Sequence, residues 1–231
     1  MERNKSLQAL LPFWDPSEIP DFPFVYICAA RRSGKTTLVK HLLLNYFQNY
    51  DIVTGICGNW HTAREYTSSG AIVEKYCHGK YDAKILKGWF RKCDELLQKG
   101  KELPRQLIVL DDILVSHAVK NETRRTSNDP YLTRLATQGR HYKCGVLLIS
   151  QSWATSLNFA RNSDIVLVAP TSLYAGNDFE SLLKNYMSGS HKKTNKQILE
   201  LFKRHDFLVL RYYKASRDQN QLLSWFRVRP S

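Results

Sequence analysis

The chain has 231 residues, of which 43% are hydrophobic, and this size and composition fit one ordinary domain with a full buried core. No apolar run reaches membrane-spanning length and no signal peptide is evident, so we expect neither an integral membrane protein nor a secreted one. The 34 Lys and Arg residues against 21 Asp and Glu give a net charge of +13. This excess favours a polyanionic partner, nucleic acid first, over a basic surface kept only for solubility.

The five cysteines are odd in number, widely spaced and free of any C-x-x-C pair. This pattern argues against structural zinc, and Cys77–His78 has no second pair to complete a metal site. Cys28 and Cys144 lie in or beside apolar, strand-like runs and are expected to be core thiols. We therefore expect a soluble protein of a reducing compartment.

The first 20 residues form an apolar stretch punctuated by prolines, where no regular helix is expected past Pro12. We predict a lead-in segment over residues 1–20 that packs Phe13 and Trp14 on the domain or on a neighbouring subunit. Residues 21–231 then form the domain itself.

Residues 28–37, Cys-Ala-Ala-Arg-Arg-Ser-Gly-Lys-Thr-Thr, are the most informative stretch. They follow an apolar run at 24–27, expected as a buried strand, and precede an apolar stripe at helical spacing over 35–48. A strand, a small-residue loop, Lys-Thr and a helix are the context of a phosphate-binding loop, whose backbone N–H groups face an anion. The alternative, a chance S-G-K-T on a solvated turn, leaves the flanking strand and helix unexplained.

The loop pattern assigns contacts to a nucleoside triphosphate. Lys35 is expected to reach the β- and γ-phosphates, and the Thr36 hydroxyl to sit on Mg²⁺. The usual pattern G-x-x-x-x-G-K-[ST] begins with Gly, where this chain has Ala29, so the turn there must be one that alanine can adopt. The predicted nucleotide-binding residues are Ala30, Arg31, Arg32, Ser33, Gly34, Lys35, Thr36 and Thr37.

A second motif ends the next long apolar run. We expect a strand over 51–57, a short helix over 61–69 and an amphipathic helix over 82–98. Residues 106–112 then predict a strand buried on both faces. Its terminal Asp111 is expected to hold Mg²⁺ directly or through water, and Asp112 to polarise the attacking water. The alternative is that both carboxylates merely begin a turn and cap the next element of the chain.

Residues 116–129 are polar and basic and are expected to form a mobile loop. A helix is expected at 130–139, with Asp129 as its N-cap. The third motif follows at residues 139–151. Gln151 follows an apolar strand and is expected beside the carboxylates, sensing the γ-phosphate or orienting water. Arg140 enters the same strand from its other end. It would reach a neighbouring subunit's γ-phosphate in trans or, equally, be a surface or DNA-facing charge.

The rest of the chain continues the alternation. We expect a strand at 164–168, helices at 176–187 and 194–204 joined by a basic linker at 188–193, and strands at 207–213 and 222–228 around a hairpin loop at 215–220. Alternating strands and helices predict an α/β fold with a mainly parallel central sheet flanked by helices and a C-terminal β-hairpin.

The three motifs together resemble the DNA-packaging ATPases of large eukaryotic DNA viruses, of the poxvirus type. These belong to the FtsK–HerA branch of the P-loop ATPases, with packaging ATPases of several internal-membrane phages, archaeal viruses and virophages. The match consists of A-x-R-x-S-G-K-T-T at 29–37, L-I-V-L-D-D at 107–112 and G-R-H…I-S-Q at 139–151, followed by N-F-A-R-N-S-D-I-V-L-V at 158–168. The resemblance covers roughly residues 22–170.

This resemblance implies a RecA/FtsK-like P-loop fold and an ATPase that hydrolyses ATP with Mg²⁺. It also implies a homo-oligomeric ring, pentamer or hexamer, that moves double-stranded DNA into a capsid, with a capsid or portal-vertex protein as a further partner. The location would be the virion or the virus factory in the host-cell cytoplasm. By matching position it assigns phosphate, metal, water-activating and sensing roles to Lys35, Thr36, Asp111, Asp112 and Gln151.

Two other functions remain open on the sequence alone: another P-loop enzyme such as a small-molecule kinase, and a nucleotide-dependent nucleic-acid-binding adaptor. For the motor, basic residues near 120–125 and 191–196 are expected to line the channel and grip DNA phosphates. Besides Arg140, the candidates for the arginine acting in trans are Arg124, Arg125, Arg134 and Arg161.

Overall fold

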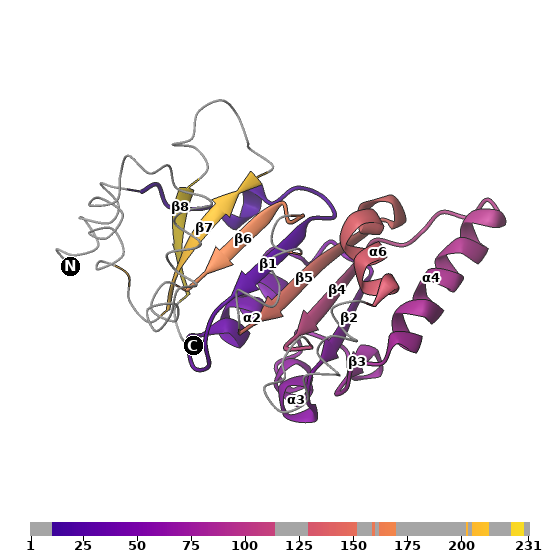
Figure 1. Cartoon of the computed structure of the whole chain (residues 1–231), viewed down its shortest axis with the longest axis horizontal. Helices are drawn as coiled ribbons and strands as arrows, with labels where there is room; N and C mark the ends of the chain where they lie inside the picture. Colours follow the sequence, from indigo (N-terminus) through magenta and orange to yellow (C-terminus); the bar gives the residue numbers. More distant parts are fainter. Residues whose placement is uncertain are drawn as a thin grey trace.

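The computed structural model describes residues 11–113, 129–151, 159, 162–169, 202, 205–212 and 223–228. Its centre is an eight-stranded sheet in the order β3-β2-β4-β5-β1-β6-β7-β8 (Figure 1). The strands are β1 (Phe24–Cys28), β2 (Ile52–Cys57), β3 (Cys77–His78), β4 (Gln106–Asp111), β5 (Cys144–Ser150), β6 (Ile165–Val168), β7 (Asp206–Arg211) and β8 (Leu223–Arg227). The helices are α2 (Lys35–Asn45), α3 (Trp60–Ser68), α4 (Ala83–Gln98) and α6 (Pro130–Gln138), with 3₁₀ turns η1 (Pro16–Glu18), η2 (Glu74–Tyr76) and η3 (Gly139–Tyr142).

The sheet is parallel from β3 to β6 and becomes antiparallel at β7 and β8. Parallel neighbours need crossover connections, and helices cover the sheet for this reason. The α/β class, the mainly parallel sheet and the antiparallel pair at its C-terminal end are confirmed.

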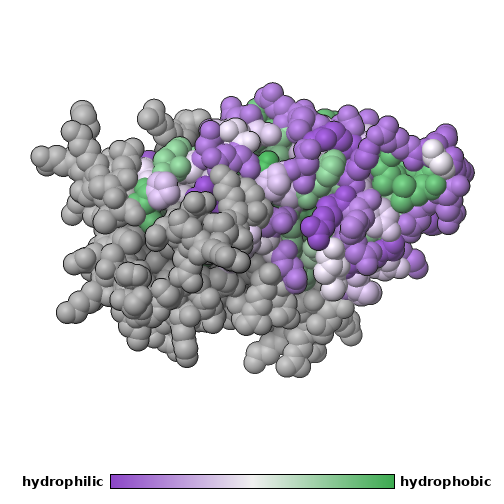
Figure 2. Space-filling model, turned by 90° about the horizontal axis from the view of Figure 1, so that it is seen from above, coloured by the Kyte–Doolittle hydropathy of each residue, from purple (hydrophilic) through white to green (hydrophobic). Residues whose placement is uncertain are grey.

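Two hydrophobic cores lie on the two faces of the sheet. Alternate residues of β1 divide between them: Val25 and Ile27 pack with α2 and α3, whereas Tyr26 and Cys28 pack with α4 and α6. Because both faces are covered, the central strands are apolar throughout instead of alternating with polar residues. In the view from above, the described part of the surface is mostly hydrophilic, with small hydrophobic areas (Figure 2).

Most expected elements that fall on described residues are present, with small shifts in their ends. The helix expected over 35–48 ends at Asn45, and Asp129 caps α6 as predicted, accepting the N–H of Tyr131 at 2.8 Å. The strand β3 was not predicted, because two residues show no periodicity. Five expected elements lie outside the described residues: the loop at 116–129 apart from Asp129, the helix at 176–187, the linker at 188–193, the helix at 194–204 apart from Phe202, and the hairpin loop at 215–220.

The lead-in residues pack on the domain of their own chain. Phe13 bridges to Trp225 of β8, the N–H of Trp14 donates to the carbonyl of Trp225 at 2.8 Å, and the N–H of Trp225 donates to the carbonyl of Pro12 at 3.0 Å. Trp14 is fully buried, while Phe13 stays half exposed, with its ring centre 5.2 Å from the Trp225 ring centre in a T-shaped arrangement. The lead-in therefore extends the sheet beside its last strand.

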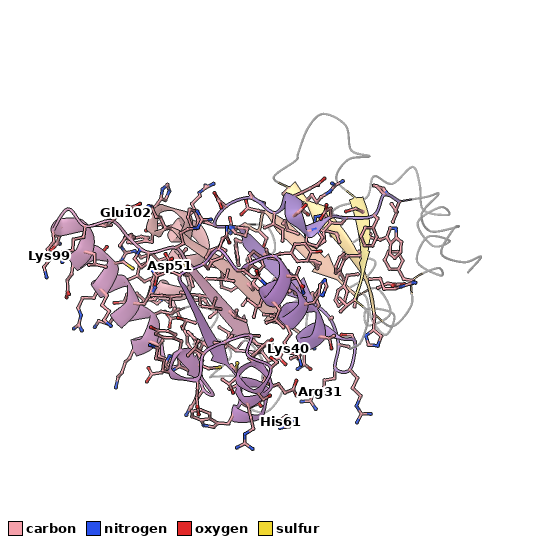
Figure 3. The ribbon with its side chains drawn as sticks, turned by 180° about the vertical axis from the view of Figure 1, so that it is seen from behind. Arg31, Lys40, Asp51, His61, Lys99 and Glu102 are labelled. Atoms are coloured by element: carbon pink, nitrogen blue, oxygen red, sulfur yellow. The ribbon has the colours of Figure 1, made fainter. Side chains whose placement is uncertain are left out.

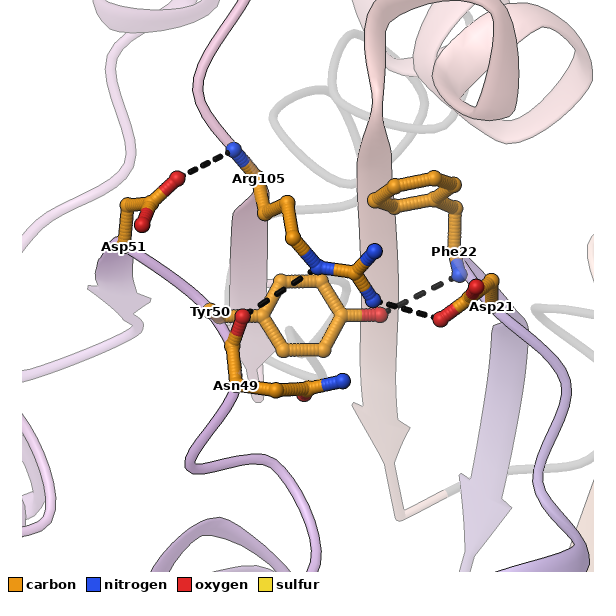
Figure 4. A network of polar contacts seen from close by, with 6 residues as sticks. All are labelled: Asp21, Phe22, Asn49, Tyr50, Asp51 and Arg105. Carbon is orange, nitrogen blue, oxygen red and sulfur yellow. Dashed lines mark hydrogen bonds and ion pairs between the residues drawn. The ribbon is translucent and has the colours of Figure 1, made fainter.

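Arg105 joins three segments at the edge of the sheet where the parallel strands begin (Figure 4). Its guanidinium donates to Asp21 at 2.5 Å and to the carbonyl of Asn49 at 3.2 Å, and it lies 4.7 Å and 5.6 Å from the ring centres of Phe22 and Tyr50. This combination favours arginine specifically, because a lysine ammonium has neither a donor fork nor a planar face to stack on the rings.

Replacing Arg105 by Lys is therefore expected to lower the free energy of unfolding by about 1–2 kcal/mol, since charge is kept but stacking and the second hydrogen bond are lost. Urea titration measures the change. The control is Arg91→Lys on α4. Arg91 forms an exposed ion pair with Glu95 at 3.6 Å, so this variant should lower the free energy of unfolding by less than about 0.5 kcal/mol. Equal losses in the two variants would contradict the role of Arg105.

Candidate nucleotide-binding site

The three sequence motifs meet at the carboxyl edge of neighbouring strands. In the register, Cys28 of β1 lies opposite Ser150 of β5, and Ile149 of β5 lies opposite Asp111 of β4. The loop after β1, the carboxylates of β4 and Gln151 after β5 are thus adjacent. Figure 3 shows this edge at Arg31 and His61, and the opposite edge at Asp51 and Glu102.

The loop begins without strain at Ala29. Its N–H continues the sheet by donating to the carbonyl of Ser150 at 3.1 Å, and positive φ angles occur only later, at Arg32 (60°) and Gly34 (93°). The expectation that an alanine fits the turn is confirmed. Gly34 is the N-cap of α2 in the left-handed region, which glycine adopts at least cost.

The carbonyl of Ala30 holds the two ends of the loop together. It accepts the Nζ of Lys35 at 3.0 Å and the hydroxyl of Ser33 at 2.6 Å. Lys35 is 8% exposed, and burial lowers its pKa, while the negative charges of Asp112 and Asp111 act in the opposite direction. A cation in this position, next to the N-terminus of α2, is well placed to attract an anion.

The outer residues of the loop differ in exposure. Arg31 and Arg32 are exposed, whereas Thr36 and Thr37 are half-buried in the first turn of α2. Arg31 projects from the carboxyl edge into solvent (Figure 3).

Asp111 is a buried carboxylate held by a residue that no sequence motif singles out. The hydroxyl of Tyr66, on α3, donates to Oδ2 of Asp111 at 2.5 Å, and Asp111 is only 2% exposed. Burial, followed by repulsion from Asp112, raises the pKa of Asp111 to about 7, although the Tyr66 hydrogen bond acts the other way. The ionised form of Asp111 is therefore unfavourable in this site, and a bound cation would stabilise it.

Asp112 and Gln151 form a direct pair. The Nε2 of Gln151 donates to Oδ2 of Asp112 at 2.5 Å, while Oδ1 of Asp112 is buried without a hydrogen-bond partner in the described part of the chain. Asp112 has φ 54°, and its N–H donates to the carbonyl of Ile149 at 3.1 Å. The predicted proximity of Gln151 to the β4 carboxylates is thus found. Oδ1 of Asp112 can still accept a hydrogen bond.

Arg140 lies apart from this group. It is exposed in η3, ahead of β5, and lines a cavity of about 160 Å³ at the opposite edge of the sheet. The seven-residue strand β5 separates that edge from Gln151, a distance of roughly 20 Å. Arg140 therefore cannot serve the phosphate loop of its own chain.

The other arginine candidates for action in trans are less available or are not described. Arg134 donates to the hydroxyl of Tyr142 and its guanidinium lies 4.3 Å from the ring centre of Phe90, so it is engaged within its own chain. Arg124, Arg125 and Arg161, and the basic segments 120–125 and 191–196, lie outside the described residues.

The oxygen donors at this edge suit Mg²⁺. Asp111 offers a second carboxylate oxygen and Thr36 a hydroxyl, and Mg²⁺ at phosphates takes only one or two protein ligands together with phosphate and water. Within the described residues, no group of three or more His, Cys, Asp and Glu side chains could hold a metal by itself. The site thus fits a metal that arrives with a phosphate ligand.

Comparisons with known proteins agree with this fold. The chain is similar in structure to the genome packaging NTPase B204 of Sulfolobus turreted icosahedral virus 2 in complex with AMP, with TM-score 0.57 and 15% identity over 88% of this chain and 96% of that one. The AMPPCP complex of B204 gives a TM-score of 0.55 and 16% identity over the same shares. The cytoplasmic domain of the Thermomonospora curvata type VII secretion ATPase EccC gives 0.56 and 11%, over 89% of this chain and 25% of that one.

No protein-family model and no curated protein matches the sequence. The chain has the fold of the P-loop NTPases, with the loop of residues 29–34 between the central strand β1 and α2. None of the helices in the described ranges has the length and apolar character to cross a membrane.

The pKa of Asp111 predicts a stability effect with a definite sign. A carboxyl whose pKa is raised on folding stabilises the fold below its unfolded value near 4, and this contribution is lost as the pH rises through about 7. In the nucleotide-free protein, Asp111→Asn should therefore raise the free energy of unfolding at about pH 8 by a few kcal/mol. The gain should shrink at about pH 5, where the native carboxyl is already neutral.

Thermal melts of both proteins at the two pH values measure this difference. Asp51→Asn, at the opposite edge of the sheet, is the control, because Asp51 is exposed and accepts the N–H of Arg105. A gain of equal size at both pH values, or a less stable Asp111→Asn at alkaline pH, would show that the buried charge is not the cause.

Proposed function

We propose that this protein is an Mg²⁺-dependent ATPase that translocates double-stranded DNA and packages a viral genome into its capsid. The convergence of Lys35, Asp111 and the Asp112–Gln151 pair at one sheet edge is the observation that carries the proposal. These side chains supply a phosphate-binding cation, a metal ligand and a positioned base, which are the parts that hydrolysis of a phosphoanhydride needs. Motifs separated in the sequence meet there because parallel strands end at the same edge.

The mechanism follows from these contacts. Lys35 exchanges the carbonyl of Ala30 for the β- and γ-phosphate oxygens, while the loop N–H groups surround the phosphates. Thr36 and Asp111 would hold Mg²⁺, which neutralises charge on the phosphate oxygens. Asp112 accepts the proton of the attacking water through its unpaired oxygen, and Gln151 fixes the carboxylate from the other side.

The choice of DNA as the partner rests on charge and on the kind of protein that shares the fold. A net charge of +13 suits a protein that tracks a phosphate backbone without reading bases. The structurally similar B204 is a genome packaging NTPase. On this proposal the chain works as a pentameric or hexameric ring in the virion or the host-cell cytoplasm, against a capsid or portal-vertex protein.

Arg140 would complete the active site of a neighbouring subunit in an arrangement where neighbours share active sites. Arg140 is exposed at the edge remote from its own loop, so in a head-to-tail ring it would face the phosphate loop of the next subunit. In the alternative, Arg140 binds DNA. Removal of its side chain would then weaken DNA binding instead of catalysis.

On this proposal, hydrolysis depends on Lys35. Lys35→Ala should lower kcat for ATP at least about 100-fold, because the β- and γ-phosphates lose their cation. Double-stranded DNA should stimulate the wild type, and the DNA concentration needed should rise steeply between about 50 and 200 mM salt as counterions compete. Steady-state phosphate release measures both effects.

Lys40→Ala is the matched control, since Lys40 lies on the same helix further from the loop (Figure 3). Wild-type hydrolysis by Lys35→Ala would overturn the site. A wild type that ignores DNA, and transfers phosphate to a small acceptor, would favour a kinase. ATP binding without turnover at any protein or DNA concentration would favour a nucleotide-dependent adaptor.

Mixtures of two inactive variants test whether Arg140 acts in trans. Arg140→Ala and Lys35→Ala should each be inactive alone, but a mixture should recover a substantial part of wild-type ATPase activity. In mixed rings, a Lys35→Ala subunit still lends its Arg140 to a neighbour whose phosphate loop is intact. Arg134→Ala, mixed in the same way, is the comparison. An Arg140→Ala variant that hydrolyses ATP normally, or a mixture with no recovery, would exclude the trans role.

A further inference from the structure

His205 touches the phosphate loop although it comes from the C-terminal part of the chain, immediately before β7. A Cβ atom placed on Gly34 would lie 2.5 Å from Nδ1 and 3.3 Å from Cε1 of His205. The imidazole edge thus rests on the glycine that precedes Lys35. Gly34 is required here both for its φ of 93° and for the space that the imidazole occupies.

The β7–β8 pair holds His205 in this place. The carbonyl of His205 accepts the N–H of Val228 at 3.2 Å. The adjacent Asp206, fully buried, accepts two hydrogen bonds from the guanidinium of Arg227, at 2.5 and 2.8 Å. A bidentate pair of this kind fixes the backbone on which the imidazole stands, so the ring is preorganised at the loop.

Nδ1 of His205 is buried and has no hydrogen-bond partner among the described residues. An unpaired buried nitrogen destabilises a fold, so a native structure that keeps one calls for an explanation. The nitrogen adjoins Gly34, whose N–H belongs to the loop that surrounds an anion. A phosphate bound in that loop therefore comes within reach of the imidazole.

We propose that His205 is a nucleotide-binding residue whose Nδ1–H donates a hydrogen bond to a phosphate oxygen of the bound nucleotide. This inference rests on the nucleotide site of the proposed function and adds to it a contact from outside the three motifs. Imidazole can donate from Nδ1 in its charged form and in one neutral tautomer, and hydrogen bonds to anionic oxygens are the stronger kind. Nucleotide occupancy is thereby linked to the C-terminal strand pair.

The test measures binding of ADP with Mg²⁺ by calorimetry to the full chain and to His205→Ala, His205→Asn and His205→Gln. Loss of the hydrogen bond in the Ala variant should weaken ADP binding about 10-fold or more. An Asn amide can take the position of Nδ1, whereas a Gln amide reaches the position of Nε2. Asn should therefore restore affinity to within about 3-fold of wild type, and Gln should not.

His61→Ala is the control, because His61 is an exposed histidine at the same edge of the sheet (Figure 3). Wild-type affinity in His205→Ala, or Asn and Gln variants that bind ADP equally, would overturn the proposal. If His205→Ala fails to fold, the comparison of Asn with Gln decides alone. A wild type that binds ADP but hydrolyses no ATP would refute the proposed motor and leave this comparison valid, whereas a wild type that binds no ADP would refute both.

Discussion

The parallel register of β1, β5 and β4 is the constraint on which the site depends. Each strand ends at the same edge, so the backbone hydrogen bonds that pair Cys28 with Ser150 and Ile149 with Asp111 also place the phosphate loop beside the two carboxylates. A shift of one residue between two of these strands would turn the functional side chains to opposite faces of the sheet. The buried apolar residues on both faces hold the register, so the packing of the cores keeps the chemistry aligned.

The same packing makes the site electrostatically costly. Asp111 is nearly inaccessible and lies next to a second carboxylate, and both conditions oppose its ionised form. Tyr66 and Lys35 offset part of this cost, and a bound cation would offset more. The buried carboxylates at this edge therefore lower the stability of the fold, a pattern that is typical of functional sites.

The lead-in residues 12–14 and the strands β7 and β8 pack together, and β7 begins next to the loop that follows β1. The lead-in adds to the sheet beside Trp225, and the Asp206–Arg227 pair fixes the start of β7, where His205 rests on Gly34. The resemblance seen in the sequence stops near residue 170, so this contact belongs to the part of the chain that carries no recognisable motif. On the proposed function, such a contact would let β7 and β8 respond to the nucleotide.

The α/β class could be predicted from the sequence, because it depends on local patterns of apolar and small residues. The same patterns located the loop of residues 29–37 and the two carboxylates at the end of β4. The sequence also predicted Gln151 beside them, since strand ends share an edge. The folded protein shows three relations that the sequence could not reveal: Tyr66 holds Asp111, His205 adjoins Gly34, and Arg140 lies far from the loop of its own chain. Those relations join residues distant in the chain, and a lone Tyr or His in a mixed polar segment carries no periodicity or spacing that could reveal its partner.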